Sequence, residues 1–328
     1  MGSHHQVDGN QLTLLRNGTE FFPQLCADID AAQHSIYLET YIFAGDETGR
    51  MVVGALLCAA ARGVVVRVLL DGFGSAQLPQ HLVNELLAAG VEVQWFRREL
   101  YRFRLRRHRL RRLHRKLAVM DGEAAFVGGI NIIDDVPRHS DSGFARLDYA
   151  VRVQGEVAGE IHVAMRRLWG AVSRANFHAR AKEIERFVLD RAKPAATPNI
   201  TFLLRDNLRH RRDIERAYLK AITGAQREIL IANAYFLPGR VFRRALKKAA
   251  QRGVRVALLL QGKVEYRLQH YATHALYDQL LAVGVEIYEY QASYLHAKIA
   301  VVDGQWATVG SSNIDPFSLL LAREANLV

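Results

Sequence analysis

The chain has 328 residues, half of them hydrophobic, which is enough for one large or two ordinary domains with a substantial core. Its formal net charge of +11 indicates anionic partners, such as nucleic acid, anionic lipid or a phosphorylated substrate, without choosing among them. No apolar run approaches the ~20 residues of a membrane span. The two cysteines lie in helix-like apolar patterns, so they indicate core residues and argue against a disulfide framework.

Helices and strands alternate in the first part of the chain. Apolar spacing predicts helices over 20–33, 51–62 and 82–89 and strands over 35–43, 64–70 and 91–96. This order favours an α/β fold with mixed, largely parallel sheets covered by helices. A further helix is predicted over 157–172, and the segment 180–197 is typical of a linker. The first five residues, MGSHH, resemble an added tag and are left out of the fold prediction.

The second part of the chain repeats the first. ALLCAAARGVVVRVLLDG returns as ALKKAAQRGVRVALLLQG, and LLAAGVEVQWF returns as LLAVGVEIYEY. The repeat predicts two similar α/β/α halves related by a pseudo-twofold. Residues 9–172 form the first half, 173–199 a helix end and linker, and 200–328 the second half.

Each half contains one copy of a polar motif. HRKLAVMDGEAAFVGGIN begins at His114, and HAKIAVVDGQWATVGSSN begins at His296, with the same spacing of His, Lys, Asp and a final Gly-[Gly/Ser]-x-Asn. The Asp-Gly pair in each copy predicts a tight turn between two strands. Alternation along the strand places the histidine and lysine of each copy on one face.

The two motifs together supply the groups that displacement at a phosphodiester requires. One histidine would attack phosphorus and the other would protonate the leaving alcohol and then deprotonate the incoming one. His114 is preferred as the nucleophile and His296 as the acid and base, although near-symmetric motifs do not decide this. The cationic and polar groups predicted to hold the phosphate oxygens are Lys116, Lys298, Asn131, Ser311 and Asn313.

Four carboxylates complete the predicted site. Asp148 and Glu324 follow the two motifs at comparable distances and are expected to orient the histidines. Asp121 and Asp303 belong to the catalytic motifs, and we expect them to support the site by bonding local backbone amides or a lysine. No cluster has metal-ligand spacing, so metal-independent chemistry without a cofactor is predicted.

The duplicated motif resembles that of the phospholipase D superfamily. LETYIFAGDETG, HRKLAVMDG, IANAYFLPG and ATVGSSNIDPFSLLLAREAN more narrowly resemble bacterial cardiolipin synthases of the type without N-terminal transmembrane helices. The resemblance implies transfer of a phosphatidyl group between two phosphatidylglycerol molecules through a phosphohistidine, with release of glycerol. Phosphatidylethanolamine is a further possible substrate, and no nucleic acid is expected. The resemblance also implies peripheral attachment to the cytoplasmic face of the bacterial inner membrane.

The resemblance has two departures, and other functions stay open. The first half has Gly129 where the second has Ser311, and the chain ends at Val328, whereas these synthases usually continue for a further segment. The alternatives are a phospholipase D-type hydrolase, a metal-independent nuclease or phosphodiesterase, and a degenerate membrane scaffold.

The first half also carries a basic insertion, RRELYRFRLRRHRLRRLH, directly before its motif. Attraction to an anionic leaflet is worth ~1 kcal/mol per Lys or Arg, and leucine and phenylalanine add insertion energy. A solvated basic loop or a nucleic-acid patch would have a similar composition. The predicted contacts with anionic lipid are Arg102, Phe103, Arg104, Arg106, Arg107, Arg109, Leu110, Arg111, Arg112 and Leu113.

Overall fold

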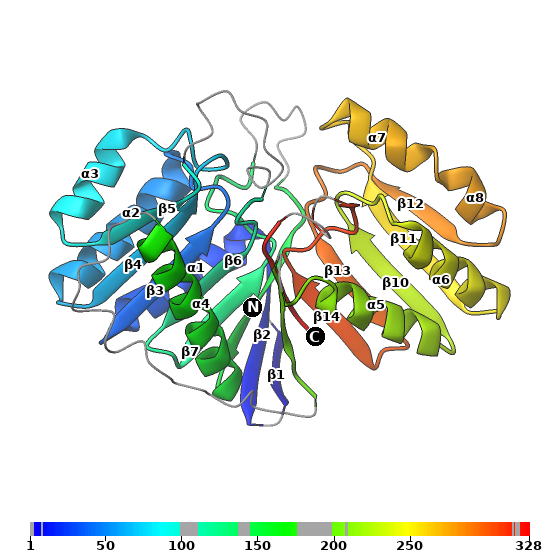
Figure 1. Ribbon diagram of the computed structural model, residues 1–328, viewed down its shortest axis with the longest axis horizontal. Helices are drawn as coiled ribbons and strands as arrows, with labels where there is room; N and C mark the ends of the chain where they lie inside the picture. The colour runs from blue at the N-terminus through cyan, green and yellow to red at the C-terminus, as the bar shows by residue number, and fades with distance from the viewer. Residues whose placement is uncertain are drawn as a thin grey trace.

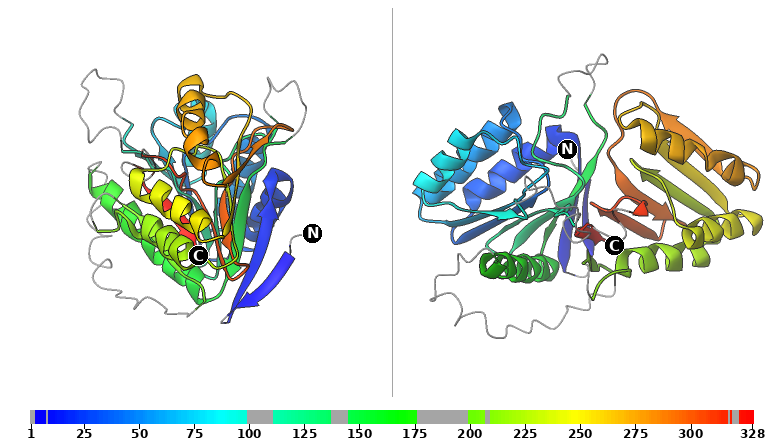
Figure 2. Two further views of the ribbon diagram at one scale, coloured as in Figure 1. Left: turned by 90° about the vertical axis from the view of Figure 1, so that its right-hand side faces the viewer. Right: turned by 45° about the horizontal axis from the view of Figure 1, so that its top comes forward.

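The computed structural model describes residues 3–7, 9–98, 111–136, 145–175, 199–206, 209–316, 318 and 322–328. These residues form two halves, each with its own sheet, that stand side by side (Figure 1). In the tilted view of Figure 2, α4 (Glu156–Ala175) and α5 (Asp213–Gly224) run along the same side of the two sheets. The predicted α/β fold with two similar halves is confirmed.

The first half is built on an eight-stranded sheet in the order β1-β2-β8-β7-β6-β3-β4-β5. Its strands are β1 (Ser3–Val7), β2 (Asn10–Arg16), β3 (Ser35–Thr40), β4 (Val65–Asp71), β5 (Glu92–Phe96), β6 (Lys116–Met120), β7 (Ala124–Gly128) and β8 (Tyr149–Gln154). Its helices are α1 (Asn17–Ala31), α2 (Glu47–Ala61), α3 (Gln80–Ala88) and α4.

The second half is built on a seven-stranded sheet in the order β12-β11-β10-β13-β14-β15-β9. Its strands are β9 (Phe202–Arg205), β10 (Glu228–Asn233), β11 (Arg255–Gln261), β12 (Glu286–Tyr290), β13 (Lys298–Val302), β14 (Trp306–Gly310) and β15 (Glu324–Leu327). Its helices are α5, α6 (Arg240–Gln251), α7 (Arg267–His274) and α8 (Tyr277–Leu281).

The predicted helices and strands of the first half are confirmed, with bounds that differ by a few residues, but the sheets are not largely parallel. Only the strands joined by helical crossovers, β3-β4-β5 and β10-β11-β12, pair in parallel. The motif hairpins pair antiparallel because a tight turn connects their two strands, and the next strand, β8 or β15, also pairs antiparallel with its hairpin. The omission of MGSHH was also wrong in part, since Ser3–Val7 pairs with β2.

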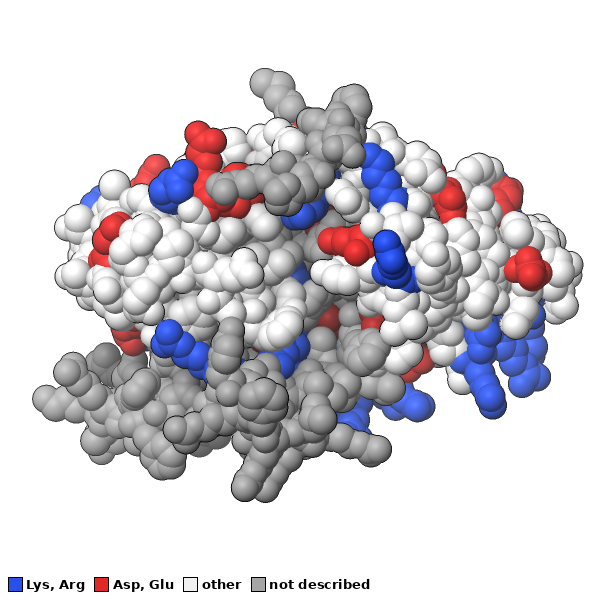
Figure 3. All heavy atoms as spheres, turned by 90° about the horizontal axis from the view of Figure 1, so that it is seen from above, with Lys and Arg blue, Asp and Glu red and all other residues white. Residues whose placement is uncertain are grey.

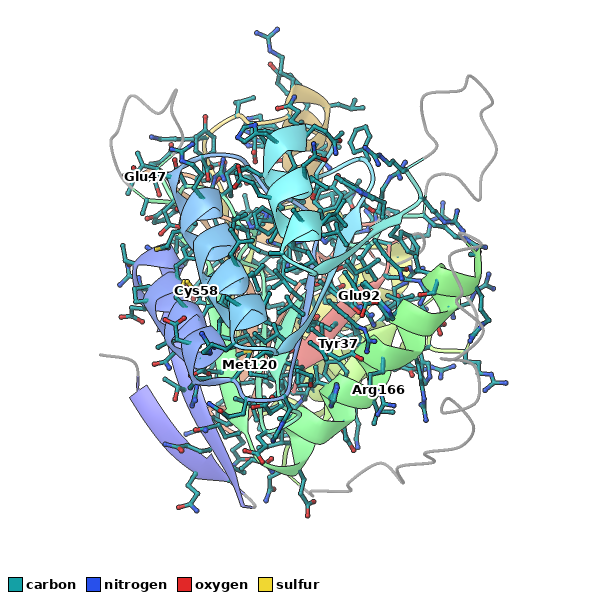
Figure 4. The ribbon with its side chains drawn as sticks, turned by 90° about the vertical axis from the view of Figure 1, so that its left-hand side faces the viewer. Tyr37, Glu47, Cys58, Glu92, Met120 and Arg166 are labelled. Atoms are coloured by element: carbon teal, nitrogen blue, oxygen red, sulfur yellow. The ribbon has the colours of Figure 1, made fainter. Side chains whose placement is uncertain are left out.

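Both faces of the first sheet are buried, which explains its almost continuous apolar strands. In β3, Ile36 and Leu38 pack beneath α1 and α2, whereas Tyr37 faces the other way and joins the cluster that contains Trp169 of α4. That second cluster also includes Leu327 of β15, so the two halves share apolar packing. The prediction of two core cysteines was half wrong, because Cys58 lies exposed on α2 (Figure 4).

The Asp-Gly turns of the two hairpins have the predicted tight geometry. Asp121 and Gly122 have φ angles of 56° and 77°, and Asp303 and Gly304 have φ angles of 55° and 70°. These left-handed conformations suit a type I′ turn, which matches the twist of the flanking strands. Each turn therefore ends one hairpin strand and starts the next in antiparallel register.

The turn aspartates tie each hairpin to the strand beside it. The carboxylate of Asp121 accepts hydrogen bonds from three backbone N–H groups at the start of β3, those of residues 33 to 35. Asp303 accepts the equivalent three bonds from residues 226 to 228, at the start of β10. The expected bonding to backbone amides is thus confirmed, although the amides lie far away in the sequence.

We predict that Asp121→Ala destabilises the fold by about 1–2 kcal/mol at neutral pH, because three backbone donors lose a charged acceptor. Burial alone would raise the pKa of Asp121, but the three backbone N–H groups hold it below its usual value. A carboxyl whose pKa is lower in the folded state stabilises the fold. This contribution is fully present above the ordinary carboxyl pKa of about 4 and is lost as the pH falls through the pKa of the folded state. The deficit of the variant should therefore shrink in acid.

Urea unfolding at neutral pH and near pH 3 measures this difference. Asp30→Ala, at an exposed position of α1, is the matched control. A deficit equal to that of the control, or one that does not change with pH, would contradict the role of Asp121.

Candidate active site

The backbone of each motif histidine is bonded to the other half of the molecule. The N–H of His114 donates to the carbonyl of Arg323 (2.9 Å), and the N–H of His296 donates to the carbonyl of Leu147 (2.9 Å). The residues that precede the histidines form short parallel bridges to the same two segments. These contacts are reciprocal, as a pseudo-twofold requires, and they bring both motifs to one place between the sheets.

A carboxylate holds each histidine ring, and the pairs cross between the halves. Nδ1 of His114 lies 3.0 Å from Oε2 of Glu324, and Nδ1 of His296 lies 2.6 Å from Oδ2 of Asp148. The structure thus pairs the two predicted carboxylates with the histidines, each with the histidine of the other half. Because Nδ1 is held in both rings, Nε2 is the nitrogen left for chemistry.

The two motif lysines are buried beside the histidines. Nζ of Lys116 donates to the carbonyl of His114 (2.7 Å), and Nζ of Lys298 donates to the carbonyl of His296. Burial, together with the neighbouring charge of Lys298, lowers the pKa of Lys116 to about 7, although Glu324 opposes the shift. Burial also lowers the pKa of Lys298. A bound anion would favour the charged form of both lysines.

His296 is neutral in the free protein. Its pKa is lowered to about 3, first by burial and then by the neighbouring charge of Lys298, which Asp148 only partly offsets. Burial alone would raise the pKa of Asp148, but Lys298 and His296 lower it below its usual value. The carboxylate is therefore ionised and accepts the Nδ1 proton of a neutral imidazole.

Ser311 holds a carboxylate, so its predicted contact with phosphate is wrong. Its fully buried hydroxyl donates to Oε2 of Glu324 (2.6 Å) and accepts from the N–H of Ala325 (3.0 Å). The matching residue of the first half, Gly129, has no room for a side chain. A Cβ there would lie 2.4 Å from Oδ1 of Asp148.

The two motif asparagines are buried directly after the second hairpin strands. Oδ1 of Asn131 accepts from the N–H of Ile42 (3.1 Å), which leaves its amide nitrogen as the donor for a phosphate. Asn313 is 3% exposed, and its Oδ1 has no hydrogen-bond partner within the described part of the chain. Phosphate binding by both residues stays a prediction.

Asp121 and Asp303 take no direct part in chemistry. Each follows the lysine of its motif by five residues of extended strand, which corresponds to ~17 Å. Their place among the catalytic residues was wrong, because the hairpin turns lie at the opposite edge of the sheets from the histidines.

Most of the predicted lipid-binding insertion, 99–110, lies outside the described residues. Arg111 and Arg112 are partly exposed, and the guanidinium of Arg112 lies 5.2 Å from the ring centre of Phe73. Leu113 cannot contact a membrane, because it is fully buried and its N–H donates to Asp71 (2.8 Å). That part of the prediction was wrong.

Three residues of the site escaped the sequence analysis. Oδ2 of Asp71 and Oε1 of Gln261 each accept the N–H of the residue before a motif histidine, at 2.8 and 2.7 Å. Their matching positions in the repeat, before Gly72 and Gly262, were a usable signal. The ring of Tyr41 lies 4.9 Å from that of His114, and no pattern in the sequence indicated this contact.

A cleft of about 590 Å³ opens between the halves. Its walls include Tyr294 and Arg146, which precede His296 and Asp148 by two residues each. Among the described residues, no three His, Cys, Asp or Glu side chains are grouped as metal ligands. No helix in the described ranges is long and apolar enough to cross a membrane.

Comparison with known proteins identifies the family of this chain. A family described as "Cardiolipin synthase, PLD-like domain" matches residues 25–144 and 218–328. The chain is 42% identical to cardiolipin synthase B of Escherichia coli (strain K12) over 322 residues, which cover 98% of this chain and 76% of the relative. It is 44% identical to cardiolipin synthase B of Salmonella typhi over 323 residues, with the same coverage.

The fold has a solved counterpart at low sequence identity. The crystal structure of phosphatidylserine synthase from Haemophilus influenzae Rd KW20 matches with a TM-score of 0.70 at 16% identity and covers 99% of this chain and 83% of that one. The family match and the two relatives show a phosphatidyltransferase of the phospholipase D superfamily. Within that superfamily, the chain belongs to the cardiolipin synthase family.

We predict that Gly129→Ala lowers turnover on the order of 100-fold, because the new Cβ displaces the Asp148 carboxylate from His296. Gly54→Ala is the matched control, since a Cβ at this position of α2 meets nothing within 4 Å. Phosphodiester turnover is compared for variants whose thermal unfolding shows that they are folded. Equal activity of the two variants would contradict the steric role of Gly129.

Proposed function

We propose that this protein is a cardiolipin synthase that transfers a phosphatidyl group from one phosphatidylglycerol to another and releases glycerol. The observation that carries the proposal is the pair of crossed histidine–carboxylate contacts with a buried lysine beside each histidine. Membership of the cardiolipin synthase family supports the lipid substrate.

In the first step, Nε2 of His114 attacks the phosphorus of phosphatidylglycerol. A P–N bond forms, the P–O bond to glycerol breaks, and His296 gives a proton to the departing oxygen. His296 is neutral in the free protein, but the negative charge of a bound phosphodiester opposes the effect of Lys298 and raises the imidazole pKa. Substrate binding thus prepares His296 to act as an acid.

In the second step, a hydroxyl of another phosphatidylglycerol gives its proton to His296 and attacks the same phosphorus. A new P–O bond forms and the P–N bond breaks, which yields cardiolipin and restores His114. Lys116 and Lys298 stabilise the charge on the phosphoryl oxygens in both steps, with the amide nitrogens of Asn131 and Asn313 as further donors.

We predict that phosphatidylglycerol vesicles incubated with this protein yield cardiolipin and glycerol in equal amounts. His114→Ala and His296→Ala should each abolish the reaction, because each removes one of two groups that act in both steps. His34→Ala, at an exposed position, is the control. Lipid chromatography and a glycerol assay measure the products.

The products also distinguish the alternatives. Phosphatidic acid without cardiolipin would make the protein a hydrolase, and cleavage of oligonucleotides without cleavage of lipid would make it a nuclease. Digestion of acid-quenched enzyme and mapping of the phosphohistidine tests His114 as the nucleophile, and phosphate on His296 would exchange the two roles.

We further propose that α7 and the loops beside it face the membrane. The carboxyl ends of β4 and β11 lie at the edge of the sheets that carries the histidines, and exposed apolar side chains follow both. Leu268 of α7 is 84% exposed and Tyr271 is 69% exposed, and α7 buries none of its residues. Phe73, after β4, is 61% exposed. Together these side chains would insert into the lipid interface at the mouth of the cleft.

The charges on this face are compatible with that orientation. Figure 3 shows the face from above, with white surface over most of its described part and both basic and acidic side chains scattered over it. Arg267 directly precedes Leu268 in α7, and Lys263 lies in the segment before the helix. Both would be attracted to anionic lipid headgroups.

We predict that the double substitution Leu268→Gln and Tyr271→Gln weakens binding to phosphatidylglycerol vesicles several-fold, because two apolar side chains leave the interface. Leu87→Gln on α3, where the leucine is 50% exposed, is the control for a loss of exposed apolar surface elsewhere. Vesicle sedimentation measures binding. Equal binding by the double variant and the control would show that α7 does not face the bilayer.

A further inference from the structure

One arginine occupies a defined place beside the general acid and base. The N–H of Leu147 donates to the carbonyl of Tyr294 (2.9 Å), and the N–H of His296 donates to the carbonyl of Leu147 (2.9 Å). This short parallel ladder sets Arg146 beside Tyr294 and Asp148 beside His296. Because side chains alternate along extended backbone, Arg146 lies on the same side as Asp148, at a spacing of about 7 Å.

Arg146 belongs to the wall of the 590 Å³ cleft. Three carboxylates share this wall, but each already accepts a hydrogen bond within the protein. Asp46 accepts from the N–H of Asp134, Asp134 accepts from the N–H of Thr48, and Glu265 accepts from the hydroxyl of Tyr235. The carboxylates therefore stabilise local structure, and Arg146 is a partly exposed cation on the cleft wall.

The matching position of the other ladder holds no cation. Alignment of the ladders, in which Asp148 corresponds to Glu324 and Leu147 to Arg323, places Ala322 opposite Arg146 in the repeat. Ala322 is buried at 9% exposure, and its carbonyl accepts from Arg205. The position that carries Arg146 in the ladder beside Asp148 thus carries no positive side chain in the ladder beside Glu324.

This asymmetry matters because the two alcohols of the proposed reaction differ. The glycerol that leaves carries no charge, whereas the phosphatidylglycerol that enters carries a phosphodiester of its own. That phosphodiester is separated from the reacting hydroxyl by the three carbons of glycerol, a length comparable to the spacing between Arg146 and Asp148. Arginine is suited to such a group because its planar fork donates two parallel hydrogen bonds to phosphate oxygens.

We propose that Arg146 binds the phosphodiester of the acceptor lipid and thereby places the acceptor hydroxyl at His296. The proposal rests on the cardiolipin synthase function proposed above and assigns the acceptor subsite of that same site. In the step concerned, the hydroxyl proton passes to His296, the new P–O bond forms, and the P–N bond to His114 breaks. Arg146 contributes to this step only when the acceptor carries a phosphate.

The test compares two acceptors on the same vesicles. Phosphatidylglycerol vesicles are incubated with the full chain in the presence and absence of ethanol, and cardiolipin, phosphatidylethanol and phosphatidic acid are measured. Arg146→Gln is expected to lower cardiolipin formation tenfold or more while phosphatidylethanol formation stays within about twofold of wild type. Arg146→Lys keeps the charge but loses the planar fork of the guanidinium, so its rate of cardiolipin formation should lie between those of wild type and Arg146→Gln.

Arg244→Gln, at an exposed position of α6, is the matched control and should leave both products unchanged. Formation of phosphatidylethanol by Arg146→Gln also shows that this variant folds and binds vesicles. Wild-type cardiolipin formation by Arg146→Gln would overturn the inference, as would an equal loss of both products. Absence of cardiolipin from the wild-type reaction would instead overturn the proposed function and this inference with it.

Discussion

Two backbone hydrogen bonds across the interface decide where the catalytic groups of this protein lie. Each runs from a motif histidine to a carbonyl of the other half, and the residue after that carbonyl is the carboxylate that holds the imidazole. One short ladder therefore positions both members of a pair, and neither half contains a complete pair. Leu147, Leu295 and Ala297 bury the ladder beside His296, and the resulting low dielectric strengthens its polar contacts.

The duplicated halves reach the same geometry with different side chains. Where Gly129 leaves space for Asp148, the second half has the longer Glu324 and a serine hydroxyl that holds it. The first half also contains a buried ion pair, Glu39–Arg115 at 2.6 Å, whose matching residues in the repeat are alanines. Removal of one partner of such a pair costs about 3–5 kcal/mol. The two sides of the site have therefore diverged while the histidine geometry is shared, which allows leaving and entering groups to be distinguished.

Residue spacing predicted most of the helices and strands and nearly all of the catalytic side chains, because the motif occurs twice in the sequence. The two orienting carboxylates were also predicted, from position and charge alone. The sequence did not predict that each carboxylate holds the histidine of the other half. This pairing depends on how segments more than a hundred residues apart pack together. For the same reason the sequence did not reveal that Ser311 bonds Glu324 or that Asp71 holds Leu113. The mixed sheets were predicted correctly, but their largely parallel pairing was wrong, because helix-strand alternation does not describe the hairpins that follow it.

The buried lysines explain why the site suits an anionic substrate. Burial lowers the pKa of both, because the charged form of a buried lysine is poorly solvated, and the neighbouring His296 is neutral. A phosphodiester between the histidines compensates these charges, and part of its binding free energy comes from that relief. The same negative charge raises the pKa of His296, which must be protonated to release the first alcohol. In the proposed reaction the acid is thus formed by the substrate it acts on.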